Sequence, residues 1–452
     1  MSYVSKIFTV TLLGLAFLLT GCDPSGLSGA DQILKETKPG TIENSSQLNE
    51  AATEYEIVDL GTLGGYTIPN EINNTGKVVG LGINALNEIR AFAWTDTEGF
   101  LELNSLGGTY SSAQAINNVG DIVGTSTFAN SNGEVKPSMW NENGDIEYLG
   151  SLGGSKGVAH DINDDGQVVG YNETSSGYNH AFIWDEASGM RDLGTLGGES
   201  SYAQGINSAG QVVGSSETSS GESHAFIWDE AGGMRSLGTL GGESSNATGI
   251  NDAGQVVGSS ETLSGESHAF IWDEAGGMRN LGTLGGIRSV ALGINNAGQV
   301  VGSSQTSSGE YHAYIWDDSV GMRDLGTLGG VNSGAYNINN VGQIVGNSTT
   351  SSGEDHVTLW NPIQNSDVTP PEISFEKVST TLWPPNHKMR LVLSDISAND
   401  NIDENPTLTV SVESNERLNG LGDGNTDEDW QIFQSEDGSY DVYLRAERSG
   451  NG

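Results

Sequence analysis

The chain has 452 residues, of which 59 are acidic and 18 are basic, and its formal net charge at pH 7 is −41. So large an excess of acid excludes nucleic-acid binding through phosphate neutralisation, and it excludes electrostatic attraction to an anionic lipid surface. The sequence contains one cysteine, Cys22, which excludes an intrachain disulfide bond.

Residues 1–21 are predicted to be a secretory signal peptide. Lys6 supplies the positive charge, and the apolar run from Phe8 to Leu19 is short for a membrane span. The next residues, Leu19-Thr20-Gly21-Cys22, resemble the lipobox of bacterial lipoproteins, in which the cysteine receives diacylglycerol and becomes the mature N-terminus. The resemblance implies an exported chain, lipid-anchored through Cys22 on the periplasmic or cell-surface face of a bacterial membrane. The alternative is a secreted protein with an accidental cysteine.

Residues 22–53 are rich in Ser, Gly, Asp, Glu, Gln and Asn and show no sustained periodicity. This composition predicts a flexible tether, which as a coil would span on the order of 30 Å.

Residues 54–361 contain a sequence repeat in which three motifs each occur seven times. From the third copy onward the copies are 44 residues apart, a length that indicates a repeat architecture. The markers are Leu-Gly-Gly beginning at Leu63, Leu106, Leu152, Leu196, Leu240, Leu284 and Leu328, Ile-Asn beginning at Ile72, Ile116, Ile162, Ile206, Ile250, Ile294 and Ile338, and the tryptophans Trp94, Trp140, Trp184, Trp228, Trp272, Trp316 and Trp360.

Each copy is predicted to hold four short antiparallel strands, because apolar residues alternate with a period of two and turn residues interrupt them about every ten positions. In one copy the predicted strands are Ala203–Asn207, Gln211–Ser215, His224–Asp229 and Met234–Leu237. Four strands in about 40 to 45 residues is the size of one β-propeller blade.

The two ends of the repeat region complement each other. The seventh copy stops at Trp360-Asn361-Pro362, before a fourth strand, whereas Glu56–Gly61 resembles a fourth strand and precedes the first copy. We therefore predict an all-β, seven-bladed β-propeller over residues 54–361 in which the N-terminal strand closes the last blade. An open solenoid such as a parallel β-helix is the alternative, but it gives no reason for complementary ends.

The repeated His-Ala-Phe-Ile-Trp and Ile-Asn-x-x-Gly-x-Val-Val-Gly motifs resemble the bacterial extracellular HAF-repeat family over residues 54–361. The resemblance implies a surface propeller of unassigned role. Five copies keep the histidine at the head of the first motif. The first copy has Arg90 at this position, and the second replaces the motif with Pro137-Ser138-Met139-Trp140.

Residues 362–369 are predicted to be a linker, and residues 370–452 resemble an Ig-like β-sandwich module of bacterial surface proteins. Leu382–Met389 and Leu444–Arg448 carry this resemblance. The module is expected to be truncated, because a complete sandwich has about seven strands. Five alternating strands are predicted, at Ile373–Val378, Met389–Leu393, Leu408–Val412, Trp430–Phe433 and Val442–Arg445.

The aromatic and histidine residues of the repeat are predicted to be structural. Phe182 and Trp184 point to one face of their strand while Ala181 and Ile183 point to the other, so the tryptophans are expected in the blade cores. The histidines are expected to hydrogen-bond a turn, since neighbouring blades hold them too far apart to share a metal ion. They are His180, His224, His268, His312 and His356.

One weak calcium site is a candidate in the C-terminal module, where side-chain oxygens alternate in an acidic segment. Its residues are Asp423, Asn425, Asp427 and Asp429, and a plain acidic loop is the alternative. The turns at residues 163–166 and 251–254 carry similar oxygens, which hairpin geometry explains. We predict no other cofactor and assign no catalytic residue, because the chain lacks a Gly-x-Ser-x-Gly elbow, a His-Glu-x-x-His motif, paired cysteines and a phosphate-binding glycine loop.

These features predict a monomeric, lipid-anchored binding scaffold at the bacterial cell envelope, with a polysaccharide or an envelope protein as its partner. An envelope-assembly scaffold would differ only in its partner. A distinct site is expected where the repeat is irregular, in the loop at residues 128–136 or the shortened segment at residues 66–70. The alternative is a carbohydrate-active enzyme, a lyase or a glycoside hydrolase, whose carboxylates meet near the propeller axis from distant parts of the sequence.

Overall fold

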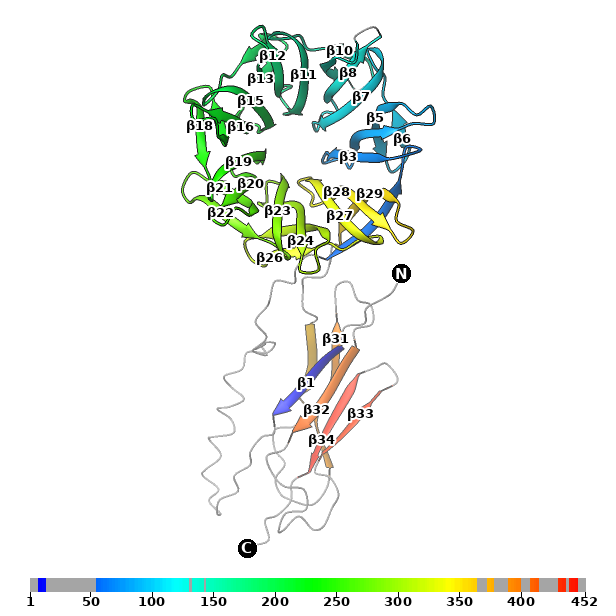
Figure 1. The fold of residues 1–452 in the computed structure, drawn as a ribbon. Coiled ribbons are helices and arrows are strands. Elements are labelled where there is room, and N and C mark those ends of the chain that lie inside the picture. The colour runs from blue at the N-terminus through cyan, green and yellow to red at the C-terminus, as the bar shows by residue number, and fades with distance from the viewer. Residues whose placement is uncertain are drawn as a thin grey trace. The chain divides into compact units, whose positions relative to one another are not determined.

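The computed structural model describes residues 7–13, 54–129, 132–141, 144–363, 372–377, 389–399, 407–413, 430–435 and 439–445. All regular elements of these residues are strands, and none is a helix, which confirms the predicted all-β class (Figure 1). The chain divides into two compact units. One spans Ala52–Ile363, and the other combines Met1–Ala51 with Gln364–Gly452.

The unit Ala52–Ile363 is a β-propeller whose four-stranded antiparallel units surround a central opening (Figure 1). We call these units blades 1 to 7, and the first strand of each borders the opening. A single bridge between Ile89 and Tyr110 joins the sheets of blades 1 and 2. The strands are, in blade 1, β3 (Thr67–Ile72), β4 (Val78–Ile83), β5 (Ile89–Thr95) and β6 (Gly99–Glu102); in blade 2, β7 (Gly107–Ile116), β8 (Ile122–Phe128), β9 (Val135–Trp140) and β10 (Ile146–Tyr148); in blade 3, β11 (Gly153–Ile162), β12 (Val168–Thr174), β13 (Asn179–Asp185) and β14 (Gly189–Asp192); in blade 4, β15 (Gly197–Ile206), β16 (Val212–Thr218), β17 (Ser223–Asp229) and β18 (Gly233–Gly238); in blade 5, β19 (Gly241–Ile250), β20 (Val256–Thr262), β21 (Ser267–Asp273) and β22 (Gly277–Gly282); in blade 6, β23 (Gly285–Ile294), β24 (Val300–Thr306), β25 (Tyr311–Asp317) and β26 (Gly321–Asp324); and in blade 7, β27 (Gly329–Ile338), β28 (Ile344–Thr350), β29 (Asp355–Pro362) and β2 (Tyr55–Gly61).

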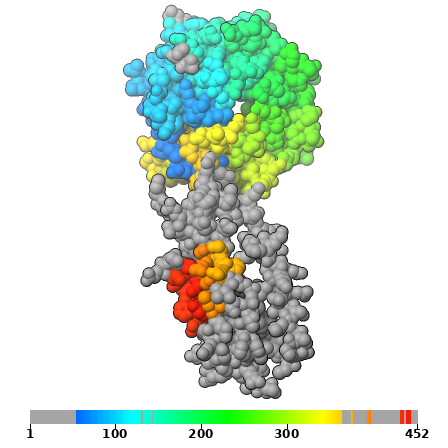
Figure 2. All heavy atoms as spheres, turned by 180° about the vertical axis from the view of Figure 1, so that it is seen from behind, coloured from blue at the N-terminus to red at the C-terminus, as the bar shows by residue number. Residues whose placement is uncertain are grey.

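Strand β2 closes the propeller. It precedes the first repeat in sequence, yet it pairs antiparallel with β29, with Ile57 opposite Trp360 and Tyr55 opposite Pro362. In the space-filling view the blue atoms from the start of this unit lie against the yellow atoms of its end (Figure 2). The predicted closure of the last blade by the N-terminal strand is confirmed, and it leaves that blade with four strands like the others.

The innermost strands are longer than the alternation pattern predicts. In blade 4 the predicted strand begins at Ala203, whereas β15 begins at Gly197. The pairing register shifts between Ala203 and Gly205, so Gln204 forms a bulge. A Cβ at Gly198 would lie 2.6 Å from the Cβ of Glu217, so only glycine allows the two strands to approach this closely. Sequence patterns count such glycines as loop residues, which explains the short prediction.

Apolar side chains pack between neighbouring blades. Ala181 and Ile183 of blade 3 contact Ala203 and Phe226 of blade 4 in one cluster, while Phe182 lies in another cluster with blade 2. The opposite faces of β13 thus serve two different interfaces, as the alternation predicts. Each repeat tryptophan lies in an inter-blade cluster of this kind, whether as a fully buried residue or packed against the cluster: Trp94, Trp140, Trp184, Trp228, Trp272, Trp316 and Trp360.

A ring of asparagine side chains links the blades at the ends of the innermost strands. The Nδ2 atom of each asparagine donates a hydrogen bond to the backbone oxygen of the equivalent asparagine in the next blade, and the last donor, Asn339, reaches Asn73 at 2.9 Å. The ring therefore closes through side chains as well as through β2. Its members are Asn73, Asn117, Asn163, Asn207, Asn251, Asn295 and Asn339.

The second unit contains a four-stranded sheet in the order β30-β31-β34-β33 and a parallel pair of β1 with β32. Each of the strands β30 to β34 overlaps one of the five predicted strands, although β31 continues past the predicted end at Leu393 to Asn399. The Ig-like class stays a prediction. Strand β1 lies in the segment predicted to be a signal peptide. Among the described residues we find no helix of the length and apolarity that a membrane crossing needs. The bounds are β1 (Ile7–Leu13), β30 (Glu372–Lys377), β31 (Met389–Asn399), β32 (Thr407–Glu413), β33 (Trp430–Gln434) and β34 (Tyr440–Arg445).

Candidate functional site

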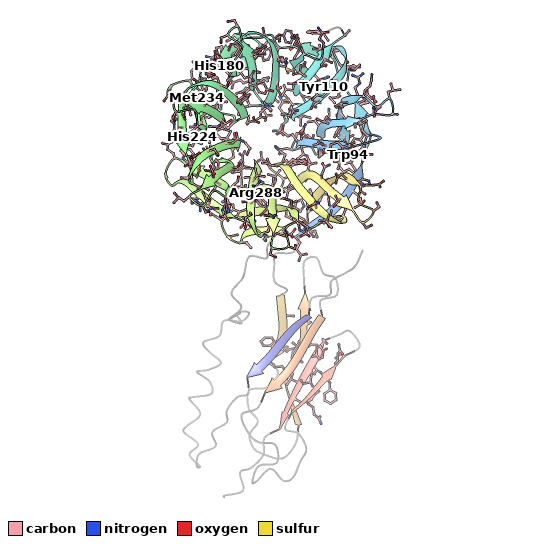
Figure 3. The ribbon with its side chains drawn as sticks, viewed as in Figure 1. Trp94, Tyr110, His180, His224, Met234 and Arg288 are labelled. Carbon is pink, nitrogen blue, oxygen red and sulfur yellow. The ribbon has the colours of Figure 1, made fainter. Side chains whose placement is uncertain are left out.

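The repeat histidines are held by their own blades. Nδ1 of each lies within hydrogen-bond distance of a side chain on the fourth strand of the same blade, rather than of a turn as predicted. His180 and His224 lie toward the outer side of the ring, and Tyr110 lies nearer the opening (Figure 3). The pairs are His180 with Asp192, His224 with Ser236, His268 with Asn280, His312 with Asp324 and His356 with Asp59.

Cys22 and the calcium candidates Asp423, Asn425, Asp427 and Asp429 lie outside the described residues. Within the described ranges, no group of three or more His, Cys, Asp or Glu side chains is arranged to hold a metal ion. The asparagine of the turn at residues 251–254 satisfies backbone groups, since Oδ1 of Asn251 accepts hydrogen bonds from the N–H groups of Ala253 and Gln255.

Two carboxylates lie on the strands that border the central opening, Glu71 on β3 and Asp161 on β11. Each accepts a hydrogen bond from the next blade. The Ile116 N–H donates to Oε2 of Glu71 at 2.9 Å, and the Ile206 N–H donates to Oδ2 of Asp161 at 2.8 Å. The other blades carry uncharged residues at this position, which are Ala115, Gly205, Gly249, Gly293 and Asn337.

Burial raises the pKa of both carboxyl groups. The pKa of Asp161 rises to about 6. The pKa of Glu71 rises well above its usual range, because of burial first and the negative charge of Asp161 second. The remaining oxygens are also engaged, since Oδ1 of Asp161 accepts from the Ile162 N–H at 2.8 Å and Oε1 of Glu71 accepts from Nδ2 of Asn337 at 3.4 Å. Through these bonds Glu71 links blade 1 to blades 2 and 7, and Asp161 links blade 3 to blade 4.

Sequence reasoning missed this pair, because its members are far apart in the chain. The available signal was the residue that precedes each Ile-Asn marker, where acids replace small residues in two copies. That signal identifies an irregular position but cannot show that the two acids interact.

An aromatic row crosses blades 2 to 4. The rings of His160 and Tyr171 lie 5.6 Å apart, and Tyr171 meets Tyr202 edge-on at 5.0 Å. Burial, together with the proximity of Tyr202 and Tyr110, raises the pKa of Tyr171. Burial lowers the pKa of His160 to about 4, so its ring is neutral at pH 7. We define the aromatic row as Tyr110, His160, Tyr171 and Tyr202.

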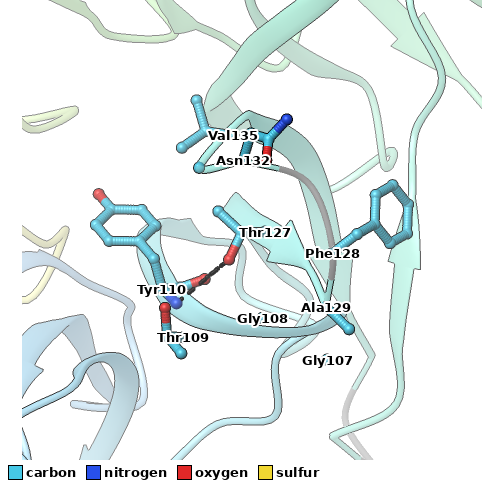
Figure 4. Close-up of a pocket in the computed structure, with 10 residues that line it drawn as sticks. Gly107, Gly108, Thr109, Tyr110, Thr127, Phe128, Ala129, Asn132 and Val135 are labelled. Carbon is cyan, nitrogen blue, oxygen red and sulfur yellow. Dashed lines mark hydrogen bonds between the residues drawn. The ribbon is translucent and has the colours of Figure 1, made fainter.

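A hollow of about 760 Å³ lies in blade 2 beside the first residue of this row (Figure 4). Phe128, Ala129, Asn132, Gly133 and Val135 of the irregular loop at residues 128–136 form part of its wall. Val123 and Trp140 are 17 positions apart, whereas the equivalent Val213 and Trp228 of blade 4 are 15 apart, so this connection is longer. The lining residues are Gly107, Gly108, Thr109, Tyr110, Thr127, Phe128, Ala129, Asn132, Gly133 and Val135.

Two cationic side chains link neighbouring blades beside the hollow. Nη1 of Arg90 in blade 1 donates to the Gly108 backbone oxygen at 2.8 Å, and Nζ of Lys136 in blade 2 donates to the Ser155 backbone oxygen of blade 3. Arg90 and Lys136 occupy the repeat position that the other blades give to histidine. Blades 1 and 2 therefore use this position to reach the next blade.

The comparisons with known proteins give a family match over part of the chain. Residues 104–240 match a family described as "Protein of unknown function (DUF3466)", a stretch that includes strands β7 to β18. No curated protein matches.

The chain is similar to several solved structures at low identity. The putative TolB from Agrobacterium tumefaciens has 12% identity and a TM-score of 0.36, and the match covers 50% of this chain and 84% of that chain. The BP39L lectin from Burkholderia pseudomallei has 8% identity and a TM-score of 0.40, covering 69% and 98%. The β-propeller domain of the Trilobed protease from Pyrococcus furiosus has 12% identity and a TM-score of 0.46, covering 65% and 95%.

Proposed function

We propose that the chain is a lipid-anchored, extracytoplasmic β-propeller that acts as a binding scaffold for a polysaccharide or a protein of the bacterial cell envelope. The observation that carries this proposal is the hollow in blade 2, which opens where the repeat is irregular. The hollow has the volume typical of ligand sites, about 300 to 1,000 Å³. The described residues of its lining offer hydroxyl, amide and aromatic groups, and among them the Tyr110 phenol is the one ionisable side chain.

The anchor is supported by the lipobox-like sequence that ends at Cys22. Replacing Cys22 with Ser removes the thiol that would receive the lipid, so we expect the variant to leave the membrane fraction. Wild-type protein and a Ser28→Ala variant serve as controls in the same cell fractionation. If the Cys22→Ser protein stays with the membranes, lipid anchoring at this residue is wrong.

A carbohydrate-active enzyme is the second candidate, because Glu71 and Asp161 lie on strands that border the opening. The raised pKa of Asp161 is a property that a general acid needs near neutral pH. Against this role, all four carboxylate oxygens already accept hydrogen bonds from the protein. Catalysis would require at least one of these bonds to break when substrate binds.

One experiment separates the two candidates. The full chain, purified in detergent, is passed over immobilised polysaccharides, and new reducing ends in the eluate are counted. Retention without new reducing ends supports the scaffold. New reducing ends that disappear in Glu71→Gln or Asp161→Asn would establish the enzyme instead. Failure to bind any polysaccharide would overturn the polysaccharide half of the proposal, and cross-linking to envelope proteins in intact cells would then test the protein half.

A further inference from the structure

Aromatic side chains are concentrated on one part of the propeller. Phe128 and Tyr148 of blade 2 are 39% and 37% exposed, and their rings meet edge-on at 5.8 Å. Tyr110 lies at the hollow and begins the aromatic row that continues to Tyr202 in blade 4. The hollow and the row together present aromatic groups from three consecutive blades.

The Thr127 side chain holds the first strand of blade 2 through the backbone of Tyr110. The Thr127 hydroxyl accepts from the Tyr110 N–H and donates to the Tyr110 backbone oxygen, both at 3.3 Å (Figure 4). Among the described residues, the Tyr110 phenol hydroxyl has no hydrogen-bond partner. Thr109 and Asn132 line the same hollow with exposed side chains. An aromatic ring, three neutral donors and acceptors and an open volume therefore lie together.

The hollow is uncharged on a strongly acidic chain. None of the lining residues that the structure describes is Asp, Glu, Lys, Arg or His. The two cations that link the blades beside it are paired with acids, Arg90 with Glu88 at 2.6 Å and Lys136 with Glu134 at 3.1 Å. An anionic polysaccharide would meet the net charge of −41 without a free cation in the lining. An uncharged ligand carries no such repulsion.

The regular blades lack this arrangement. Ser200 in blade 4 and Ser244 in blade 5 stand where blade 2 has Tyr110, and their connections between second and third strands are the short ones. The propeller backbone therefore does not require a tyrosine at this position. The aromatic residue is an addition to the repeat, as is the longer loop whose residues Asn132 and Gly133 line the same hollow.

We propose that the hollow of blade 2, with the adjoining aromatic row, binds a neutral polysaccharide, a chain of uncharged hexoses. The apolar C–H faces of the sugars would lie against the rings of Tyr110 and its neighbours, and their hydroxyl groups would bond Thr109, Asn132 and the Tyr110 phenol. The inference rests on the proposed scaffold function and deepens it by naming the site and the ligand class.

Affinity electrophoresis tests this proposal with the full chain in detergent. The protein runs through native gels that contain laminarin, hydroxyethyl cellulose or glycogen as neutral probes, or alginate as an acidic probe. We expect at least one neutral glucan to retard the protein. Tyr110→Ser copies the residue that blades 4 and 5 use, so it should fold, and loss of the stacking ring should weaken binding about tenfold. Tyr110→Phe keeps the ring and should retain most of the binding.

The matched control is Tyr311→Ala, because Tyr311 lies on blade 6 and is 39% exposed. It should leave retardation unchanged, and thermal melting of every variant reports folding. If Tyr110→Ser folds and is retarded as strongly as wild type, the site is wrong although the scaffold function stands. If no neutral glucan retards the wild type, or only alginate does, the ligand class is wrong. Cross-linking to an envelope protein would in that case leave the broader function intact.

Discussion

Blades 4 and 5 differ from blades 2 and 3 in their surfaces more than in their framework, whereas blade 1 also has a shorter first strand, of six residues against ten. The second and third strands of blades 4 and 5 are identical in sequence, Val-Val-Gly-Ser-Ser-Glu-Thr and Ser-His-Ala-Phe-Ile-Trp-Asp. Blade 2 changes most of these residues, yet Val123 pairs with Met139 as Val213 pairs with Ile227 in blade 4. The comparison shows that the repeat preserves pairing and packing while loop length and exposed residues vary.

The irregular features of the repeat also occur in consecutive blades. The hollow, the two cations that reach the next blade and the carboxylates Glu71 and Asp161 all belong to blades 1 to 3. Blades 4 and 5 also reach the next blade with cations, but through arginines of the fourth strand, where Arg235 pairs with Glu274 and Arg279 pairs with Asp318. A propeller built from near-identical units can therefore confine a ligand site to a few blades without altering the others.

The largest expected effect on stability comes from removing β2, the strand that closes the irregular blades and the regular blades into one ring. Deleting residues 54–61 removes β2, whose Tyr55, Ile57, Val58 and Leu60 pack against two of the buried clusters. We expect a loss of several kcal/mol of unfolding free energy from the exposed apolar area, and the single sharp melting transition should disappear. Calorimetry checks this. A deletion variant that still melts in one sharp transition would show that closure does not unite the blades.

A glycine substitution tests whether the framework is equally tight in both regions. A Cβ at Gly124 in blade 2 would lie 2.0 Å from the Ser112 backbone oxygen, and one at Gly258 in blade 5 would lie 2.0 Å from the Asn246 backbone oxygen. Gly124→Ala and Gly258→Ala should each cost about 3 kcal/mol of unfolding free energy, because the backbone must move. Urea denaturation measures both. A clearly smaller cost in blade 2 would mean that the irregular region has a looser framework.

The asparagine ring offers a third test of the same comparison. Nδ2 of Asn251 donates to the Asn295 backbone oxygen at 3.1 Å, and the residue is 3% exposed. Asn251→Ala should lower the unfolding free energy by about 2 kcal/mol, since it leaves buried backbone groups without partners. Asn117→Ala should have a similar effect in blade 2. Asn251→Asp keeps the acceptor oxygen for the turn but turns a carboxylate oxygen toward the Asn295 backbone oxygen, also an acceptor, so it should cost more than Asn251→Ala in urea denaturation at pH 7.

The smallest expected effect is a gain in unfolding free energy, and it concerns the acid pair Glu71 and Asp161. Glu71→Gln keeps an oxygen for the Ile116 N–H and removes the repulsion by Asp161, so it should raise the unfolding free energy at pH 7 by about 1 kcal/mol. Because folding raises the pKa of Asp161 to about 6, wild-type stability should fall as the pH rises from about 4 to 6. This fall should be smaller in the variant.

Denaturation at pH 4 and pH 7 measures the effect of Glu71→Gln. Glu243→Gln makes the same charge change at an exposed site and is the control. A variant that is less stable than wild type at pH 7 would show that the carboxylate of Glu71 is needed to join blades 1 and 2.

The sequence predicted the strands and the closure because both depend on local patterns. Alternation locates the strands, and the fourth-strand motif at Glu56–Gly61 is recognisable before any folding is considered. The interacting groups were not predictable in the same way. Glu71 and Asp161 lie on different blades, and Tyr110, Tyr171 and Tyr202 occupy different positions in their repeats. The loop at residues 128–136 was identified by its length, but the hollow is also lined by Gly107–Tyr110 of β7, which the length of the loop does not reveal.

The pairing of β2 with β29 also determines how the propeller responds to mechanical load. The two strands are antiparallel, and the Ile363 N–H donates to the Glu54 backbone oxygen at 2.7 Å, so the chain enters and leaves the propeller at the same end of this pair. Tension between the segments that flank residues 54 and 363 would peel the strands apart one rung at a time, instead of shearing all rungs together. Blade 7 would unfold first, because the pairing of β2 with β29 is the contact that closes the ring.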